Sequence, residues 1–275
     1  MEQTVLKEKL NKLEEIILGY GQMIVALSGG VDSTFLLAFA AEAYRKAGCP
    51  DNVAAITATG PQFAADEAEY AAALCESLGV AHKKIRVAYV LDLIKDNPPD
   101  RCYHCKKELF SMLKARADMV GSVLVDGTNL DDLDDYRPGY CAIQELGVAS
   151  PLKDAGLTKA EIRQALAALD IGRAAEKADY PAFACLMTRI PFVEEITEEK
   201  LDMIYKAESY LKEHGLTQVR VRCHEITGGL LARVELLPEE MPKLDPAECD
   251  AAMRGIGFEF VTLDLGGYEK GKMNR

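Results

Sequence analysis

The sequence has no apolar run of the roughly 18 to 20 residues that a membrane-spanning helix requires. Residues 1–20 mix lysines with glutamates and lack the apolar core and small-residue cleavage site of a signal peptide. Basic residues are scarce relative to acidic ones, 32 against 44, and the net charge of −12 disfavours broad binding to nucleic acid, which depends on clustered Lys and Arg. We therefore expect a cytoplasmic protein without a membrane role or an extended nucleic-acid surface.

The chain has 275 residues and is 49% hydrophobic, which is enough for a substantial core in one large or two smaller domains. We expect two domains. The sequence also contains eight cysteines. In a cytoplasmic chain of this size, reduced thiols, metal ligands or catalytic sulfur are better interpretations of these cysteines than disulfides.

Short apolar runs alternate with helical patterns through the first half of the sequence. The predicted strands cover 23–27, 53–58, 84–87 and 123–126, and the predicted helices cover 3–19, 32–47, 66–78 and 106–117. This alternation predicts an α/β fold with a doubly wound, Rossmann-like parallel sheet, which binds ligands beyond the carboxyl ends of its strands. Farther along, Thr158 and Glu161 have the spacing of a capping box at the start of another helix.

The pattern changes after Pro191. A helix near 197–214 is followed by strands at 218–223 and 230–236, a further helix, and a strand at 258–265. We therefore predict a first domain over residues 1–192 and a second, smaller α/β domain over residues 193–275.

One strand-to-helix connection, SGGVDST at residues 28–34, has the composition of a phosphate-binding loop. Glycines let the backbone approach a ligand closely, and the start of the following helix directs unpaired N–H groups at an anion. Asp32 would be repelled by phosphate unless it binds Mg²⁺ or water, so we assign it a magnesium role. A turn whose glycines serve only packing is the alternative, which seven compatible residues in succession disfavour. The predicted nucleotide-binding residues, including two at or just beyond the carboxyl end of the strand at 123–126, are Ser28, Gly29, Gly30, Asp32, Ser33, Thr34, Asp126 and Asn129.

Three of the cysteines form a candidate sulfur site. Cys102 and Cys105 make a Cys-x-x-Cys pair, and Cys185 lies 80 residues beyond Cys105. Such thiolates can share a metal or a cluster, and a [4Fe–4S] cluster with three cysteine ligands would keep an open iron for an extra sulfide. Zinc, with or without His104, is a competing interpretation, and a redox disulfide is another. We expect the other five cysteines to be small buried residues: Cys49, Cys75, Cys141, Cys223 and Cys249.

The loop lacks the lysine of a Walker motif and instead resembles the PP-loop of the adenine nucleotide α-hydrolase-like superfamily, which includes GMP, NAD and asparagine synthetases and tRNA-thiolating enzymes. Further motifs over nearly the whole chain are similar to the LarE family, the sulfur transferases that help build the nickel-pincer nucleotide cofactor of lactate racemase. The motifs that carry this resemblance are Ser28–Thr34, Asn97–Lys107, Asp126–Asn129, Asp135–Gly139, Cys185–Arg189, Val219–Arg222 and Val261–Gly267.

The resemblance implies that ATP adenylates a carboxylate of pyridinium-3,5-biscarboxylate mononucleotide, after which sulfur displaces AMP and leaves a thiocarboxylate. One type of member sacrifices the sulfur of a single cysteine, which would be Cys185 here. In another type three cysteines hold a [4Fe–4S] cluster that carries a transferable sulfide. Because Cys102 and Cys105 accompany Cys185, the cluster type is favoured.

The resemblance also implies roles for residues outside the loop and the cysteines. Lys106 would hold the adenylate phosphate, with a solvated helix lysine as the alternative. Arg137 would join Asp126 and Asn129 at the nucleotide or substrate site, where a simple turn is the alternative. The residues implied for a polar pocket in the C-terminal domain, of which the two arginines would bind the mononucleotide phosphate, are Glu208, Arg220, Arg222 and Glu235.

Two other functions compete with this one. A tRNA thiolase also combines a PP-loop with cysteines, but the acidic charge and the lack of a basic appendage disfavour it. A nucleotide-binding module with structural zinc would bind ATP without releasing pyrophosphate. For the favoured function we expect ATP, Mg²⁺ and a [4Fe–4S] cluster as cofactors and a separate sulfide donor. The family resemblance implies a homo-oligomer, for which a hexamer is one form.

Overall fold

The computed structural model describes residues 2–133, 138–169, 171, 173–179, 184–269 and 271–274. The chain forms two compact units. The first consists of residues 1–60, 65–90 and 102–182, and the second consists of residues 61–64, 91–101 and 183–275. The second unit thus includes three stretches, 61–64, 91–101 and 183–192, that the sequence pattern places in the first domain.

The first unit is built on a parallel sheet of four strands. These are β1 (Met23–Ala26), β2 (Val53–Thr59), β3 (Ala81–Arg86) and β4 (Val123–Val125). Their order in the sheet is β3-β2-β1-β4, and each pair is parallel. A further parallel bridge joins Val125 to Ala149 beside β4. The predicted parallel α/β sheet is confirmed, and its winding direction reverses between β1 and β4.

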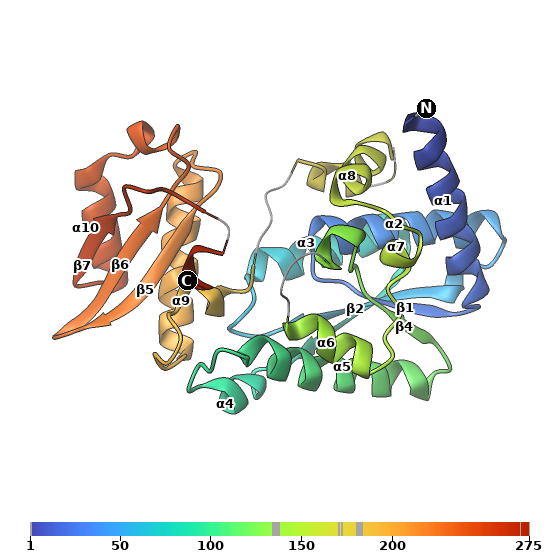
Figure 1. The fold of residues 1–275 in the computed structure, drawn as a ribbon, viewed down its shortest axis with the longest axis horizontal. Coiled ribbons are helices and arrows are strands. Elements are labelled where there is room, and N and C mark those ends of the chain that lie inside the picture. The colour runs from blue at the N-terminus through green and yellow to red at the C-terminus, as the bar shows by residue number, and fades with distance from the viewer. Residues whose placement is uncertain are drawn as a thin grey trace. The chain divides into compact units, whose positions relative to one another are not determined.

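Helices cover both faces of this sheet (Figure 1). Helices α1, α2, α7 and α8 lie on one face, with α2 in contact with α1 and α8, whereas α5 and α6 lie on the other. The capping box predicted for α8 is confirmed, because the Thr158 hydroxyl accepts a hydrogen bond from the Glu161 amide and the Glu161 carboxylate accepts one from the Thr158 amide. The helices are α1 (Glu2–Gly19), α2 (Val31–Lys46), α3 (Ala65–Leu78), α4 (Val90–Ile94), α5 (Arg101–Met119), α6 (Pro138–Glu145), α7 (Pro151–Asp154) and α8 (Lys159–Ala168).

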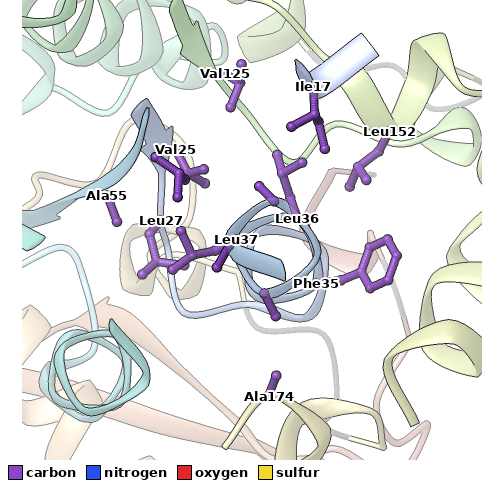
Figure 2. Close-up of a cluster of buried hydrophobic side chains, with 14 of the residues drawn as sticks. Ile17, Val25, Leu27, Phe35, Leu36, Leu37, Ala55, Val125, Leu152 and Ala174 are labelled. Carbon is purple, nitrogen blue, oxygen red and sulfur yellow. The ribbon is translucent and has the colours of Figure 1, made fainter. Parts of the chain in front are cut away.

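Helix α2 lies at the centre of the first unit's core. Figure 2 shows its side chains Phe35, Leu36 and Leu37 pointing outwards in different directions among residues of the sheet and the neighbouring helices. All three are fully buried. A helix that is buried on most sides is held by packing, so truncating one of these leucines to alanine would cost about 2–5 kcal/mol. This packing fixes the position of the loop that precedes α2.

Helix α5 starts earlier than its sequence pattern predicts, at Arg101 instead of residue 106. Pro98 and Pro99 cannot continue a helix backwards, but the Arg101 amide already donates to the Pro98 carbonyl at 3.0 Å. The cysteine pair therefore lies in the first two turns of α5 and not in a loop before it.

The second unit has a smaller sheet, with β5 and β6 as an antiparallel hairpin and β7 parallel to β6. Val221 and Val234 are cross-strand partners with almost no exposed surface. Helix α9 packs on β5 and α10 on β7. Among the described residues no helix is both long and apolar enough to cross a membrane. The elements of this unit are α9 (Glu198–Glu213), β5 (Arg220–Ile226), β6 (Gly229–Glu235), α10 (Pro246–Ile256) and β7 (Phe260–Leu263).

Candidate active site

The predicted phosphate-binding loop connects β1 to α2 in the first unit. Gly30 is the N-cap of α2 and makes no side-chain cap, and its own amide donates to the Ser28 hydroxyl at 3.3 Å. The Ser33 hydroxyl donates to the Gly30 carbonyl at 3.2 Å and lies 3.1 Å from the Ser28 hydroxyl. Thr34 is fully buried. The loop therefore presents backbone N–H groups at the end of a 16-residue helix, which is the geometry of an anion site.

Two glycines make the close approaches around this loop possible. Gly29 has a φ of 80°, and a Cβ there would lie 2.8 Å from the Glu67 carbonyl oxygen of α3. A Cβ on Gly127, after β4, would lie 2.9 Å from the backbone nitrogen of Ser33. Because backbone atoms cannot move aside cheaply, both positions require glycine. The backbone at Gly127 therefore packs directly on the start of α2. A glycine that served only to form a turn would not need this close contact.

A charged group forms next to the loop. Asp32, in the first turn of α2, accepts a hydrogen bond from the Asn129 side-chain amide at 3.2 Å. Its other carboxylate oxygen is paired with the ammonium of Lys159, the first residue of α8. The side chains of Lys159 and Asp32 are 32% and 20% exposed, so this ion pair is partly exposed. The lysine supplies a positive charge next to Asp32.

Asp126 lies at the carboxyl end of β4, in the same region of the first unit. Its carboxylate is buried and accepts hydrogen bonds from the Ser150 hydroxyl at 2.7 Å and from Thr128. Burial raises the pKa of Asp126, although these hydrogen bonds and the charge of Lys106 act in the opposite direction. Lys106 on α5 lies over the Phe110 ring at 4.9 Å, and the absence of a side chain on Gly139 makes room for its stem.

The predicted nucleotide residues therefore come together at one edge of the sheet. Ser28, Asp32 and Ser33 follow β1, whereas Asp126 and Asn129 follow β4. These are the two strands between which the winding direction reverses, and ligands of doubly wound sheets bind at this position. The predicted Arg137 lies outside the described residues.

The cysteines have different environments. Cys102 and Cys105 are three residues apart on α5 in the first unit, Cys102 partly exposed and Cys105 buried. Cys185 belongs to the second unit, is partly exposed, and precedes the short 3₁₀ helix Leu186–Arg189. Among the described side chains, no three of His, Cys, Asp or Glu form a group that could hold a metal ion. The cluster assignment stays a prediction.

The expectation for the other cysteines is confirmed only for three of the five. Cys75, Cys223 and Cys249 are buried, and burial raises the pKa of Cys75 to about 11 and that of Cys223 to about 12. Cys49 is only partly buried and Cys141 is exposed. Cys141 occupies a helix position that faces solvent, which a residue-type preference for burial cannot predict.

Arg189 fixes the backbone around Cys185. This arginine has no exposed surface, and its guanidinium donates to the carbonyls of Ala184 at 2.6 Å and Cys185 at 3.1 Å. Its other nitrogens make a bidentate pair with Glu208 at 2.8 and 2.9 Å. Burial alone would lower the pKa of Arg189, but the Glu208 carboxylate outweighs it and raises that pKa.

The residues predicted for the polar pocket are all buried in the second unit. Glu208 also accepts from the Val221 amide, and burial would raise its pKa, but Arg189 outweighs burial and lowers it. Arg222 pairs with Glu235 at 2.7 and 3.0 Å. Arg220, whose guanidinium lies 5.2 Å from the centre of the Tyr268 ring, has its pKa lowered to about 10 by burial and by the charge of Arg189.

Two charged residues of these sites, Lys159 and Arg189, are not among those predicted from the sequence. Lys159 pairs with a residue 127 positions away, and no local pattern indicates such a pair. Arg189 ends the Cys185 motif but carries no signal that it would be fully buried. The capping box of Thr158 and Glu161 predicts that a helix begins next to Lys159, but it gives no indication of the lysine's partner.

Comparisons with known proteins support the predicted family. A model of the asparagine synthase family matches residues 21–106. The chain is 39% identical over 277 residues to an uncharacterised protein of Synechocystis sp., with 98% of both chains covered. It is 29% identical to an uncharacterised protein of Methanocaldococcus jannaschii, with 89% of both covered.

A third relative has a defined name. The chain is 33% identical over 257 residues to the pyridinium-3,5-bisthiocarboxylic acid mononucleotide synthase of Lactiplantibacillus plantarum, covering 92% of this chain and 89% of that one. This similarity extends through both structural units, and the loop after β1 belongs to the matched asparagine synthase region. The chain therefore belongs to the LarE family of ATP-using enzymes with a PP-loop domain.

Proposed function

We propose that this protein is an ATP-dependent sulfur transferase that converts a carboxylate of pyridinium-3,5-biscarboxylate mononucleotide into a thiocarboxylate. The observation that carries the proposal is the group of Asp32, Asn129 and Lys159 beside the start of α2, in which the charged Asp32 and Lys159 are partly exposed and Asn129 is buried. The named relative from L. plantarum supports the choice of substrate and product.

The first step in this proposal is adenylation. A carboxylate oxygen of the substrate attacks the α-phosphorus of ATP, the bond to the bridging oxygen breaks, and pyrophosphate leaves. The N–H groups of residues 31–33, at the start of α2, bind the phosphates, as helix N-termini do. Asp32 binds Mg²⁺, and Lys159, released from its pair with Asp32, moves its charge to a phosphate oxygen. Positioning and charge stabilisation of this kind supply most of the catalysis in such transfers.

Lys106 and the polar pocket have separate roles in the proposal. Lys106, whose charge acts on Asp126, binds the adenylate phosphate. Arg220 and Arg222, supported by Glu208 and Glu235, bind the phosphate of the mononucleotide. The lowered pKa of Arg220 means that its surroundings disfavour its charge, so an added phosphate would stabilise it. Arg137 is proposed as a further substrate contact.

In the second step a sulfur nucleophile attacks the acyl carbon and AMP leaves. We propose Cys102, Cys105 and Cys185 as ligands of a [4Fe–4S] cluster, which when bound supplies the transferable sulfide. Cys102 and Cys105 fit this group, because residues three apart on a helix share a face and thiolates are the ligands that such clusters use. A separate sulfide donor and a homo-oligomeric assembly complete the proposal.

One experiment tests the adenylation step. The protein is incubated with ATP, Mg²⁺ and the mononucleotide, and pyrophosphate and AMP are measured. The proposal expects pyrophosphate release that requires the mononucleotide and is lost in Asp32→Ala. Binding of ATP without pyrophosphate release, together with stoichiometric zinc and no iron, would instead identify a nucleotide-binding module.

A second experiment tests the sulfur source. Anaerobically purified or reconstituted protein is analysed for iron and sulfide in the wild type and in Cys102→Ser, Cys105→Ser and Cys185→Ser, with Cys249→Ser as a control. The cluster proposal expects loss of the normal cluster in the first three variants and retention in the control. Normal clusters in all four would contradict the ligand assignment, and loss of one sulfur atom from Cys185 after turnover would identify the sacrificial route.

A further inference from the structure

The C-terminal segment of the second unit folds back onto the hairpin of β5 and β6. The Asp264 amide donates to the Val234 carbonyl at 2.9 Å, and the Tyr268 amide donates to the Leu236 carbonyl at 2.8 Å. Between them, Gly267 has a φ of 67°, and a Cβ there would lie 2.9 Å from the same Leu236 carbonyl oxygen. This position therefore requires glycine. The backbone of Tyr268 is thereby fixed at the end of β6.

Charged side chains hold the same segment in place. The Asp264 carboxylate accepts a hydrogen bond from Arg233 of β6 and pairs with the Lys272 ammonium at 2.7 Å. The Lys272 ammonium also donates to the Gly267 carbonyl at 2.9 Å. Residues on both sides of Tyr268 are thus bound to the rest of the segment or to the hairpin, so the Tyr268 ring has a defined position.

The ring of Tyr268 lies next to the guanidinium of Arg220, a residue of β5. The guanidinium carbon is 5.2 Å from the ring centre, within the range of a cation–π contact. Arg220 is buried, whereas Tyr268 is partly exposed. Arg220 also donates to the Val219 carbonyl at 2.7 Å. The ring therefore restricts the rotation of this guanidinium, whose N–H donors have directions fixed by its plane.

We infer that Tyr268 is a positioning residue for a phosphate group bound at Arg220, because its firmly held ring sets the orientation of that guanidinium. This inference rests on the proposed function, in which Arg220 binds the phosphate of the mononucleotide. A guanidinium recognises phosphate best through two parallel hydrogen bonds, so its orientation decides whether both can form. If the ring served only to fill space, its loss would reduce stability and leave the affinity for phosphate unchanged.

The ring also favours the charge of Arg220. Burial and the charge of Arg189 lower the pKa of Arg220 to about 10, whereas Glu208 and Tyr268 act in the opposite direction. An aromatic face attracts a nearby cation, most strongly where water is excluded. Tyr268→Phe keeps this face, and Tyr268→Leu replaces it with an aliphatic side chain. Phosphate binding should therefore survive the first substitution and be weakened by the second.

Calorimetry on the full-length protein tests this role. Binding of the mononucleotide and of the nucleoside that lacks its phosphate is measured in the wild type, Tyr268→Phe and Tyr268→Leu. Tyr210→Leu is the matched control, because Tyr210 is also a partly exposed aromatic residue of the second unit and its ring lies 4.1 Å from that of His214. We expect Tyr268→Leu to bind the mononucleotide about tenfold more weakly, the factor for loss of a desolvated cation–π contact, and to bind the nucleoside unchanged. Tyr268→Phe and Tyr210→Leu should bind both ligands as the wild type does.

A second measurement separates this inference from the proposed function. Arg220 is modified with phenylglyoxal, with and without inorganic phosphate, and its modification is quantified by peptide mapping. We expect phosphate to protect Arg220 in the wild type and in Tyr268→Phe, and to protect it far less in Tyr268→Leu. A wild type that does not bind the mononucleotide but shows this protection pattern contradicts the proposed substrate and supports the positioning role. Equal protection in the wild type and Tyr268→Leu overturns the inference, as does a loss of nucleoside binding as large as the loss of mononucleotide binding.

Discussion

Replacing Lys159 with methionine separates a phosphate contact from a stabilising ion pair. The Lys159–Asp32 pair is partly exposed, with 32% and 20% of the two side chains accessible. Ion pairs of this exposure contribute at most about 1 kcal/mol to stability. A lysine that donates a charge-assisted hydrogen bond to a phosphate contributes about 1.5–3 kcal/mol to binding, or about tenfold to a hundredfold in affinity. The substitution should therefore affect nucleotide use far more than folding.

The first unit contains a matched control for this experiment. Lys9 pairs with Glu161 at 2.7 Å, and their side chains are 25% and 22% exposed, close to the values for Lys159 and Asp32. Lys9→Met and Lys159→Met should lower the melting temperature by similar small amounts. Only Lys159→Met should weaken the binding of ATP and of pyrophosphate, measured by calorimetry, and lower kcat/KM for pyrophosphate release.

The reasoning is refuted if Lys159→Met and Lys9→Met bind pyrophosphate equally well. In that case Lys159 would serve only to neutralise Asp32 in the absence of ligand. A further comparison, Asp32→Asn, should raise the Mg²⁺ concentration needed for half-maximal pyrophosphate release if Asp32 binds the metal ion. If Asp32→Asn keeps an unchanged magnesium requirement, the metal role passes to another residue of the site.

The remaining predictions concern stability and one close approach. The Glu240 carboxylate accepts hydrogen bonds from the Thr217 amide and hydroxyl, and although burial acts to raise its pKa, these bonds lower it. The ionised carboxylate therefore contributes to the free energy of unfolding above the pKa of an unfolded glutamate. This contribution is lost as the pH falls through the lowered pKa of the folded protein. Glu240→Gln should therefore cost about 1–3 kcal/mol in urea unfolding near pH 7 and progressively less in acid, and a deficit independent of pH would contradict this. Gly127→Ala places a Cβ 2.9 Å from the Ser33 nitrogen, so it should lower the free energy of unfolding by about 1–3 kcal/mol and weaken ATP binding. Gly255→Ala on α10 has open space around the new Cβ, so it should raise the free energy of unfolding by about 0.5–1 kcal/mol. Equal melting temperatures for the two glycine variants would count against the close-approach argument.

The sheet could be predicted from the sequence because its strands are short apolar runs separated by helical periodicity. Strands buried on both faces have this pattern, and the predicted strand at 23–27 differs from β1 by a single residue. The strand predicted at 84–87 begins three residues earlier, at Ala81. The polar Lys83 and Lys84 obscure that start, because β3 is an edge strand of which only Ile85 is buried.

The start of α5 could not be predicted for a related reason. Cys102, Tyr103 and His104 have weak intrinsic helix propensity, so local preference gives little signal over this turn. The helix there is held by contacts made at a distance in sequence, among them the hydrogen bond of Arg101 to Asn97 and its stacking on Phe192. Tertiary contacts of this kind override propensity but leave no periodic pattern.

The partner of Asp32 illustrates which information was missing. Asp32 and Lys159 lie in the first turns of α2 and α8. Helix α2 follows β1, which is a strand of the parallel sheet. The chain that leads to α8 passes through Ala149, which forms a parallel bridge with Val125 in the same sheet. Residues that follow parallel strands lie at the same edge of a sheet. Because the order in the sheet is β1-β4-Ala149, the two helices begin near each other. The sequence supplies the carboxylate, the lysine and both helix starts. What it lacks is the sheet order, and that order alone converts two charges 127 residues apart into a site.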